Sequence, residues 1–251
     1  MQYKYEKETH DYSDLSSGRV FYSVPGYPAF PIRLASEIFQ RCLASREEIY
    51  KNSSLCSLYD PCCGAAYHLS VLAYLHGRQL RGIIASDIDE KAVALAKRNL
   101  GLLSATGLDQ RIGEITAMLE QYQKESHQDA LKSAYRIRDG ISALGQERKL
   151  ATQVFQASAT DRQAILEHIQ PRSVDIVFTD VPYGQHSQWK GLSEPSDPLG
   201  SMLDTLLEIL SPASIVAITS DKRQKASHEK YQRVEQFLAG KRRVAILRPV
   251  L

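Results

Sequence analysis

The sequence predicts an α/β fold of the Rossmann-like type: a doubly wound, mostly parallel sheet of six or seven strands, with an inserted helical pair and an N-terminal extension. Two observations predict this fold. Short apolar runs alternate with segments of helical periodicity along most of the 251 residues. The apolar runs are nearly continuous, which is typical of strands that helices cover on both faces.

The elements follow one another in a regular order. Leu69, Leu72 and Leu75 share one face of the first helix after a strand, and Asp89 is a good N-cap for the next helix. The strands are expected at 54–60, 81–87, 151–157, 173–180, 213–220 and 242–249. The helices between them are expected at 67–76, 90–100, 164–169, 198–210 and 228–239.

Two segments lie outside this alternation. We expect these segments and the alternating part to form one domain over residues 1–251. In the N-terminal extension, residues 1–50, a possible seventh strand at 18–23 and a Pro-rich connection precede a helix at 32–50. Residues 108–150 predict two inserted helices, over 108–124 and 128–150. Their charges balance, six basic against five acidic from Glu120 to Leu150. An inserted pair packed on the domain is therefore the first interpretation, and a substrate-facing lid is the alternative.

Composition adds one asymmetry. The net charge is only +2, but residues 222–251 carry nine Lys or Arg against two acids. This basic end would suit phosphate groups, or would equally be a solvated helix face with a basic strand end.

Several common features are missing from the sequence. The four cysteines form no C-x-x-C or Cys/His cluster, so we expect free thiols in a reducing cytoplasm and no metal. The polar N-terminus predicts no signal peptide. No apolar run approaches the roughly 20 residues of a membrane span, so we expect no membrane partner.

The stretch LYDPCCGAA, residues 58–66, turns the first strand into the first helix, where parallel sheets bind ligands. It lacks the G-x-G-x-x-G of a dinucleotide site, and Asp60 precedes its glycine, Gly64. An acid there favours a cationic group over a diphosphate. Asp87, at the end of the second strand, would accept both ribose hydroxyls, because Asp89 is better placed to cap the helix. Together these residues suggest S-adenosylmethionine.

Three motifs carry a family resemblance. DPCCGAA, ASDID and TDVPYG resemble the cofactor and [DNS]-P-P-[YF] motifs of class I S-adenosylmethionine-dependent methyltransferases. More closely, the chain is similar to the avilamycin-resistance 23S rRNA guanine methyltransferase family, through these motifs, GRVFYSVPGYPAFPIRLASEI (18–38) and HSQWKG (186–191). The likeness covers most of the chain and is weakest in 108–150.

The resemblance implies a set of cofactor-binding residues. Phe30 stands where related enzymes close over the methionine part of the cofactor, although packing at the helix entry is nearly as good a role for it. The implied cofactor-binding residues are Phe30, Asp60, Cys62, Gly64, Asp87, Ile88, Ser158, Asp161 and Asp180.

The chain departs from the family pattern at three positions. Ala66 replaces the second glycine; we expect a slightly reshaped turn there, because a positive φ would cost on the order of 1 kcal/mol. Ser158 stands where the third strand usually ends in an acid, with Asp161 three residues on. Val181 replaces the first proline of the catalytic motif, which should be harmless because only its carbonyl is needed.

The TDVPYG turn is the predicted catalytic segment. Asp180 and the Val181 carbonyl would accept hydrogen bonds from a nucleobase amino group, which localises its lone pair; if ring N1 is the target, Asp180 would take the proton. Pro182 fixes the turn and Tyr183 offers a stacking face for a flipped base. The sequence does not separate the two nitrogens.

Five further residues are expected to contact RNA: Trp189, which would otherwise anchor its loop, and the basic residues Lys190, Lys222, Arg223 and Lys225.

The sequence therefore predicts an S-adenosylmethionine-dependent enzyme, monomeric and cytoplasmic, that methylates a guanine base nitrogen in 23S rRNA, either naked or in a ribosomal particle. A DNA adenine or protein glutamine methyltransferase shares the same turn and is the first alternative. An RNA-binding protein with a degenerate cofactor pocket is the second, motivated by Ala66 and Ser158. The missing G-x-G-x-x-G disfavours a dehydrogenase.

Overall fold

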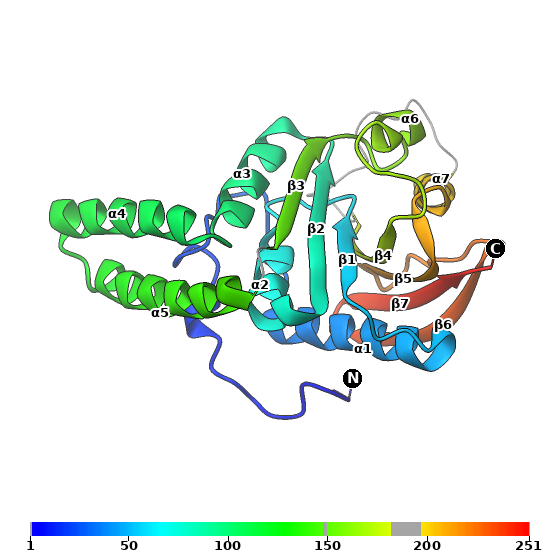
Figure 1. The fold of residues 1–251 in the computed structure, drawn as a ribbon, viewed down its shortest axis with the longest axis horizontal. Helices are drawn as coiled ribbons and strands as arrows, with labels where there is room; N and C mark the ends of the chain where they lie inside the picture. Colours follow the sequence, from blue (N-terminus) through cyan, green and yellow to red (C-terminus); the bar gives the residue numbers. More distant parts are fainter. Residues whose placement is uncertain (1, 148–149, 182–196, 251) are drawn as a thin grey trace.

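The computed structural model describes residues 2–147, 150–181 and 197–250. A seven-stranded sheet with the order β3-β2-β1-β4-β5-β7-β6 forms its centre (Figure 1). The first five of these pair in parallel, and β7 and β6 add an antiparallel edge. The strands are β1 (Cys56–Asp60), β2 (Leu80–Asp87), β3 (Ala151–Gln156), β4 (Val174–Asp180), β5 (Leu210–Asp221), β6 (Tyr231–Ala239) and β7 (Arg242–Pro249). The predicted fold class is confirmed.

Helices cover both faces of the sheet, as a doubly wound fold requires. One core cluster joins the sheet to α1 (Ile32–Tyr50), α2 (Tyr67–His76) and α3 (Glu90–Gly101). A second cluster joins the other face to α6 (Arg162–Leu166) and α7 (Pro198–Leu207). Side-chain caps begin α3 and α7: Asp89 accepts the Lys91 N–H at α3, and Asp197 accepts the Gly200 N–H at α7, where proline follows the cap. Leu210, expected at the end of the helix over 198–210, instead begins β5.

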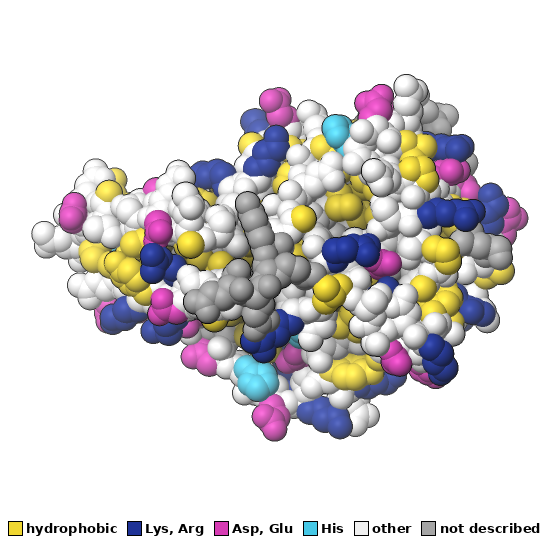
Figure 2. Space-filling model, in the orientation of Figure 1, with side chains coloured by type: hydrophobic (Ala, Val, Ile, Leu, Met, Phe, Trp, Pro, Cys, Tyr) yellow, Lys and Arg dark blue, Asp and Glu magenta, His cyan; other side chains and the backbone are white. Residues whose placement is uncertain are grey.

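The helical insertion is an antiparallel pair, α4 (Ala105–Tyr122) and α5 (Glu125–Glu147), that extends sideways from the sheet (Figure 1). Its buried seam, which includes Ile112 and Ala134, continues into Leu15 of the N-terminal segment and Val71 of α2. The contacts therefore place the base of the pair against α2 and the N-terminal segment. On the face seen in Figure 2, basic and acidic side chains are interspersed.

The predicted helix over 228–239 is wrong, because this segment is the edge strand β6. Tyr231 packs in the core on one side of the sheet, whereas Phe237 packs on the other. A strand normally places residues six apart on the same face. The register shift between Arg233 and Glu235 removes that alternation, and the apolar side chains then fall at helix-like intervals.

The predicted strand over 18–23 is also wrong. Val20 and Phe21 are buried against α2 and the helical insertion. The backbone of Tyr22 pairs with a side chain instead of a strand: its N–H donates to Asn99 Oδ1 at 2.7 Å, and its carbonyl accepts from Asn99 Nδ2 at 3.1 Å. One buried asparagine therefore satisfies the hydrogen bonds that a sheet would otherwise supply.

Candidate active site

Three adjacent strands end in an aspartate at the same edge of the sheet, Asp60 on β1, Asp87 on β2 and Asp180 on β4, and β5 beside them ends in Asp221. The strand order reverses between β1 and β4, which is where open α/β sheets bind ligands. The fold brings the three acids close enough for Asp87 and Asp180 both to act electrostatically on Asp60.

Asp60 is fully buried and poorly compensated. Its Oδ1 accepts the Cys62 N–H at 2.9 Å, whereas its Oδ2 has no hydrogen-bond partner in the described part of the chain. Burial, together with the charges of Asp87 and Asp180, raises the pKa of Asp60 to about 8, although Thr179 and the Cys62 N–H act to lower it. His68 Nε2 lies 3.3 Å away, but burial lowers the pKa of His68 to about 4, so this ring is neutral at neutral pH. A cationic ligand would supply the missing compensation.

The turn between β1 and α2 is wound in the left-handed region. Gly64 and Ala66 both have φ of +51°, so the expectation that alanine reshapes this turn is wrong. Ala66 keeps the conformation that its methyl group disfavours. A methyl group on Gly64 would meet the Tyr27 ring at 3.6 Å, so Tyr27 covers this turn.

Asp89 caps the next helix, α3, as the sequence suggests. Asp87 is oriented by two backbone groups, the N–H of Gly64 at 2.8 Å and the N–H of Asp89 at 2.9 Å. A carboxylate held in this way presents a fixed edge to a ribose. Burial and the neighbouring charge of Asp89 raise the pKa of Tyr27, so its phenol stays protonated beside them.

The remaining predicted cofactor residues lie around the ends of β2 and β3. Ser158 bonds to Thr160 at 2.9 Å, and Asp161 caps α6 by accepting the Ala164 N–H at 3.0 Å. The Ile88 carbonyl accepts the Gln156 side-chain amide at 2.9 Å. Burial raises the pKa of the Cys62 thiol well above its ordinary value, so this thiol is neutral.

Asp180 is the rim acid of the site, with a side chain 24% exposed. The Thr219 hydroxyl donates to its Oδ1 at 2.6 Å, and Arg242 Nη2 lies 3.6 Å from its Oδ2. Burial raises the pKa of Asp180, while the Thr219 hydrogen bond and the Arg242 charge oppose the rise. Phe30 lies 5.0 Å below the Arg242 guanidinium, and its ring also packs on His68. Phe30 thus contacts both His68, which lies beside Asp60, and Arg242, which lies beside Asp180.

Sequence reasoning missed four residues of this site: Tyr27, His68, Thr219 and Arg242. His68 follows the DPCCGAA motif by two residues, and Thr219 is the last residue but one of the fifth predicted strand, so the sequence indicates their positions but not their roles. Arg242 was counted only within the basic end of the chain. Because β7 runs antiparallel to β5, its first residue meets the carboxyl end of β5, where it pairs with Asp221 in the sheet.

The predicted RNA contacts are described in part. Lys222, Arg223 and Lys225 are exposed on the segment after β5, and the Lys222 N–H bonds to the Lys241 carbonyl beside Arg242. These cations therefore lie at the same edge of the sheet as the acids. Pro182, Tyr183, Trp189 and Lys190 lie outside the described residues.

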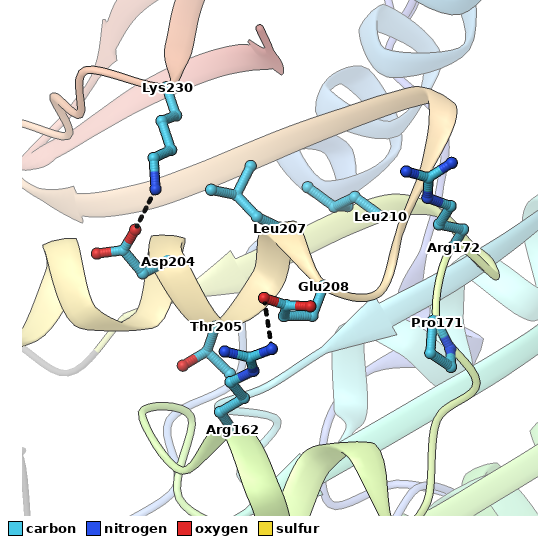
Figure 3. A pocket seen from close by; sticks show the side chains of 9 residues that line it. All are labelled: Arg162, Pro171, Arg172, Asp204, Thr205, Leu207, Glu208, Leu210 and Lys230. Carbon is cyan, nitrogen blue, oxygen red and sulfur yellow. Dashed lines mark ion pairs between the residues drawn. The ribbon is translucent and has the colours of Figure 1, made fainter. Parts of the chain in front are cut away.

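A separate cavity of about 600 Å³ lies beside α6 and α7, near the amino ends of β4 and β5 (Figure 3). Its charged side chains pair with each other, Arg162 with Glu208 at 2.9 Å and Lys230 with Asp204 at 3.6 Å. None of the residues predicted for the site lines it. We therefore place the chemistry at the aspartate cluster and not in this cavity.

All four cysteines are free, as predicted. Within the described ranges no helix combines the length and the apolar character needed to cross a bilayer.

Comparison with known proteins shows which family the chain belongs to. Residues 1–242 match the family described as rRNA methyltransferase AviRa. The 23S rRNA (guanine(2535)-N(1))-methyltransferase of Streptomyces viridochromogenes is 37% identical over 246 residues, which cover 98% of this chain and 95% of that protein. Two solved structures of the rRNA methyltransferase AviRa from the same organism superpose with a TM-score of 0.88 at 36% identity, covering 100% of this chain and 97% of theirs. The resemblance inferred from the motifs is confirmed: the chain belongs to the AviRa family of rRNA methyltransferases.

Proposed function

We propose that the protein transfers a methyl group from S-adenosylmethionine to N1 of a guanine in 23S rRNA. The observation that carries the proposal is the presence of two aspartates in different environments at the point where the strand order reverses. Asp60 is deep and lacks a compensating cation, whereas Asp180 stands on the rim with Thr219 and Arg242 beside it. The relative from Streptomyces viridochromogenes, which is named for guanine N1, supports the choice of atom.

The residues present suit S-adenosylmethionine. The free Oδ2 of Asp60 and its raised pKa favour a ligand that carries positive charge, and the sulfonium and ammonium of this cofactor provide it. Asp87 would accept the ribose hydroxyls, and Gly64 lets the backbone approach the ligand closely. Phe30, Ile88 and Ser158 would border the rest of the molecule. When bound, the cofactor supplies an already activated methyl group, so the protein has mainly to position and deprotonate the acceptor.

Asp180 would act as the general base. Guanine N1 carries a proton at neutral pH and must lose it before it attacks the methyl carbon. A carboxylate whose pKa is raised by burial is a better proton acceptor than one in water, provided that it stays ionised. Thr219 occupies Oδ1 and leaves Oδ2 as the oxygen that faces the rim and Arg242.

RNA binding would combine phosphate contacts with extrusion of the target base. Lys222, Arg223 and Lys225 are placed to bind phosphates, which position an RNA without reading its sequence. Pro182, Tyr183, Trp189 and Lys190 stay predictions for the segment that holds the flipped base. A single domain that acts as a monomer in the cytoplasm, where ribosomes are assembled, completes the proposal.

The test is methyl transfer from labelled S-adenosylmethionine to 23S rRNA, followed by nucleoside analysis. Wild-type protein should yield 1-methylguanosine. Asp180→Asn should lower the rate by about 10²–10⁴-fold, because it removes the base, while cofactor affinity changes little. Asp129→Asn, an exposed acid on α5, is the matched control and should leave the rate unchanged. N2-methylguanosine as the product would reject the N1 assignment, and an undiminished rate in Asp180→Asn would reject the base.

A further inference from the structure

We propose that Arg242 reads O6 of the target guanine and stabilises the negative charge that develops there when N1 loses its proton. This inference rests on the proposed function and adds a second substrate-contacting residue to it. The two side chains concerned, Asp180 and Arg242, come from strands far apart in the sequence, β4 and β7, and meet only because β7 is antiparallel.

Arg242 is fixed at the rim, but its neighbours do not occupy all of its hydrogen-bond donors. Its guanidinium lies over the Phe30 ring, and its side chain is 23% exposed, close to the 24% of Asp180. Its Nε is buried and has no hydrogen-bond partner among the described residues. A guanidinium is always charged and carries five N–H donors, so donors remain for a ligand.

The spacing of the pair also differs from that of a structural ion pair in the same molecule. Arg242 Nη2 is 3.6 Å from Asp180 Oδ2, beyond hydrogen-bond length, whereas Arg81 Nη2 is 2.8 Å from Asp175 Oδ2. The Asp180–Arg242 pair therefore presents a carboxylate acceptor and a guanidinium donor side by side, each only partly satisfied by the other.

This donor–acceptor pair matches one base edge. Guanine places its O6 acceptor next to its N1–H donor, so O6 would meet Arg242 while N1–H meets Asp180. Adenine carries the reverse pattern, an amino donor beside an N1 acceptor, and would set donor against donor and acceptor against acceptor. Sites built from such hydrogen bonds discriminate strongly, because a wrong partner leaves buried polar groups unpaired.

The same contact has a role in the reaction. When Asp180 takes the N1 proton, the electron pair left on N1 is shared with O6 through the ring amide. N1 then forms a bond to the methyl carbon, the carbon–sulfur bond breaks, and its electrons neutralise the sulfonium. Until the new bond forms, O6 carries part of a negative charge, and a cation aimed at it lowers the energy of the transition state.

A purely electrostatic effect on Asp180 is the competing explanation. If Arg242 served only to keep Asp180 ionised, its removal would raise the pKa of Asp180 and move the acid limb of the rate profile to higher pH. The rate would then recover fully once the pH exceeds the new pKa. If Arg242 binds O6, the rate at the plateau falls as well, and raising the pH does not restore it.

The experiment is single-turnover methyl transfer to an RNA transcript over a pH series that follows the rate from its acid limb to its plateau. Arg242→Gln should lower the plateau rate by about 10²–10³-fold, the usual effect of losing one donor to a developing oxyanion, with cofactor affinity unchanged. Arg242→Lys keeps the charge but loses the planar set of guanidinium donors. Its plateau rate should fall at least about tenfold and should still exceed that of the Gln variant. Arg248→Gln is the matched control, because Arg248 lies on the same strand and its side chain bonds to Gln232 within the described residues.

The possible outcomes separate cleanly. Full recovery of Arg242→Gln at high pH overturns the O6 contact and leaves Arg242 as a group that tunes Asp180. If Arg242→Gln fails to bind the cofactor or to fold, Arg242→Lys decides, and a wild-type plateau rate in that variant also overturns the inference. Failure of the proposed function is seen earlier, in wild-type protein that makes no 1-methylguanosine, and the O6 contact is rejected with it.

Discussion

Replacing Asp60 by asparagine should make the free protein more stable and the enzyme worse. Asparagine has the shape of aspartate and can still accept the Cys62 N–H through its oxygen. Its amide would replace Oδ2, the buried atom that lacks a hydrogen-bond partner among the described residues, and would point towards His68 at 3.3 Å. The substitution thus removes an uncompensated buried charge.

The magnitude follows from the pKa. In the folded protein the pKa of Asp60 is raised from its ordinary 3.8 to about 8, so the stability that the neutral acid provides is complete below about pH 4 and is lost as the pH rises to about 8. Each pH unit in that window costs about 1.4 kcal/mol, which sets a ceiling of about 6 kcal/mol. Rearrangement of the free site around the ionised carboxylate recovers part of this cost, and we expect a gain of about 2 kcal/mol at pH 8.

Thermal unfolding of the free protein across this pH range is the assay. A gain of about 2 kcal/mol corresponds to about 4–8 °C for a chain of this size. The difference between Asp60→Asn and wild type should grow from pH 4 to pH 8 and then stay constant. Asp175→Asn is the control, because Asp175 is a buried carboxylate that already accepts from Ser57 and pairs with Arg81, and its loss should lower the melting temperature.

Calorimetry with S-adenosylmethionine gives the second readout. Wild-type protein near neutral pH should release protons when it binds the cofactor, because the cation lowers the pKa of Asp60, and its affinity should rise with pH up to about 8. Asp60→Asn should release none and should bind about 10–100-fold more weakly, the usual value of a charge-assisted contact. A variant that is less stable at every pH and binds normally would show that Asp60 is a structural residue and refute this reasoning.

Two further predictions concern the turn and the basic edge. Ala66→Gly should stabilise the protein by about 1 kcal/mol in denaturant unfolding, because the φ of +51° suits glycine; an unchanged or lower midpoint would mean that the alanine methyl gains more from packing than it loses in strain. Neutralising Lys222, Arg223 and Lys225 together should weaken RNA binding uniformly across sequences. The slope of log affinity against log salt should flatten by about 0.7–0.9 for each phosphate that the protein no longer neutralises. A filter-binding series with an unchanged slope would show that these residues do not contact the RNA.

Most of the fold could be read from the sequence because its elements carry local signals. The helix at 67–76 has the predicted bounds, since the strand, the turn with its glycine and the helix follow one another directly. The acids at positions 60, 87 and 180 could be placed together for the same reason: each ends a parallel strand, and the carboxyl ends of such strands share one edge.

The missed role of Arg242 traces to a single element. Gly240, with a φ of +61°, and Lys241 form the two-residue turn of a β6–β7 hairpin. With a helix expected over 228–239, nothing marked the last strand as antiparallel, and Arg242 could not be assigned to the edge that carries Asp180. The register shift gives β6 its helix-like apolar spacing and lets it pack on both faces of the sheet. The local sequence does not contain the tertiary contacts that this packing needs.

The two central carboxylates show how one residue type takes two roles in one site. Burial raises the pKa of both, but Asp60 is fully buried with only a neutral histidine nearby, whereas Asp180 has a hydroxyl donor and a guanidinium at the rim. The first environment raises the free energy of the ionised carboxylate until a cation binds beside it, which suits a positively charged cofactor. The second keeps the charged form available at the opening through which an RNA base must enter, which suits a base. The environments, and not the residue type, therefore assign the roles, and a carboxylate of intermediate depth would serve neither.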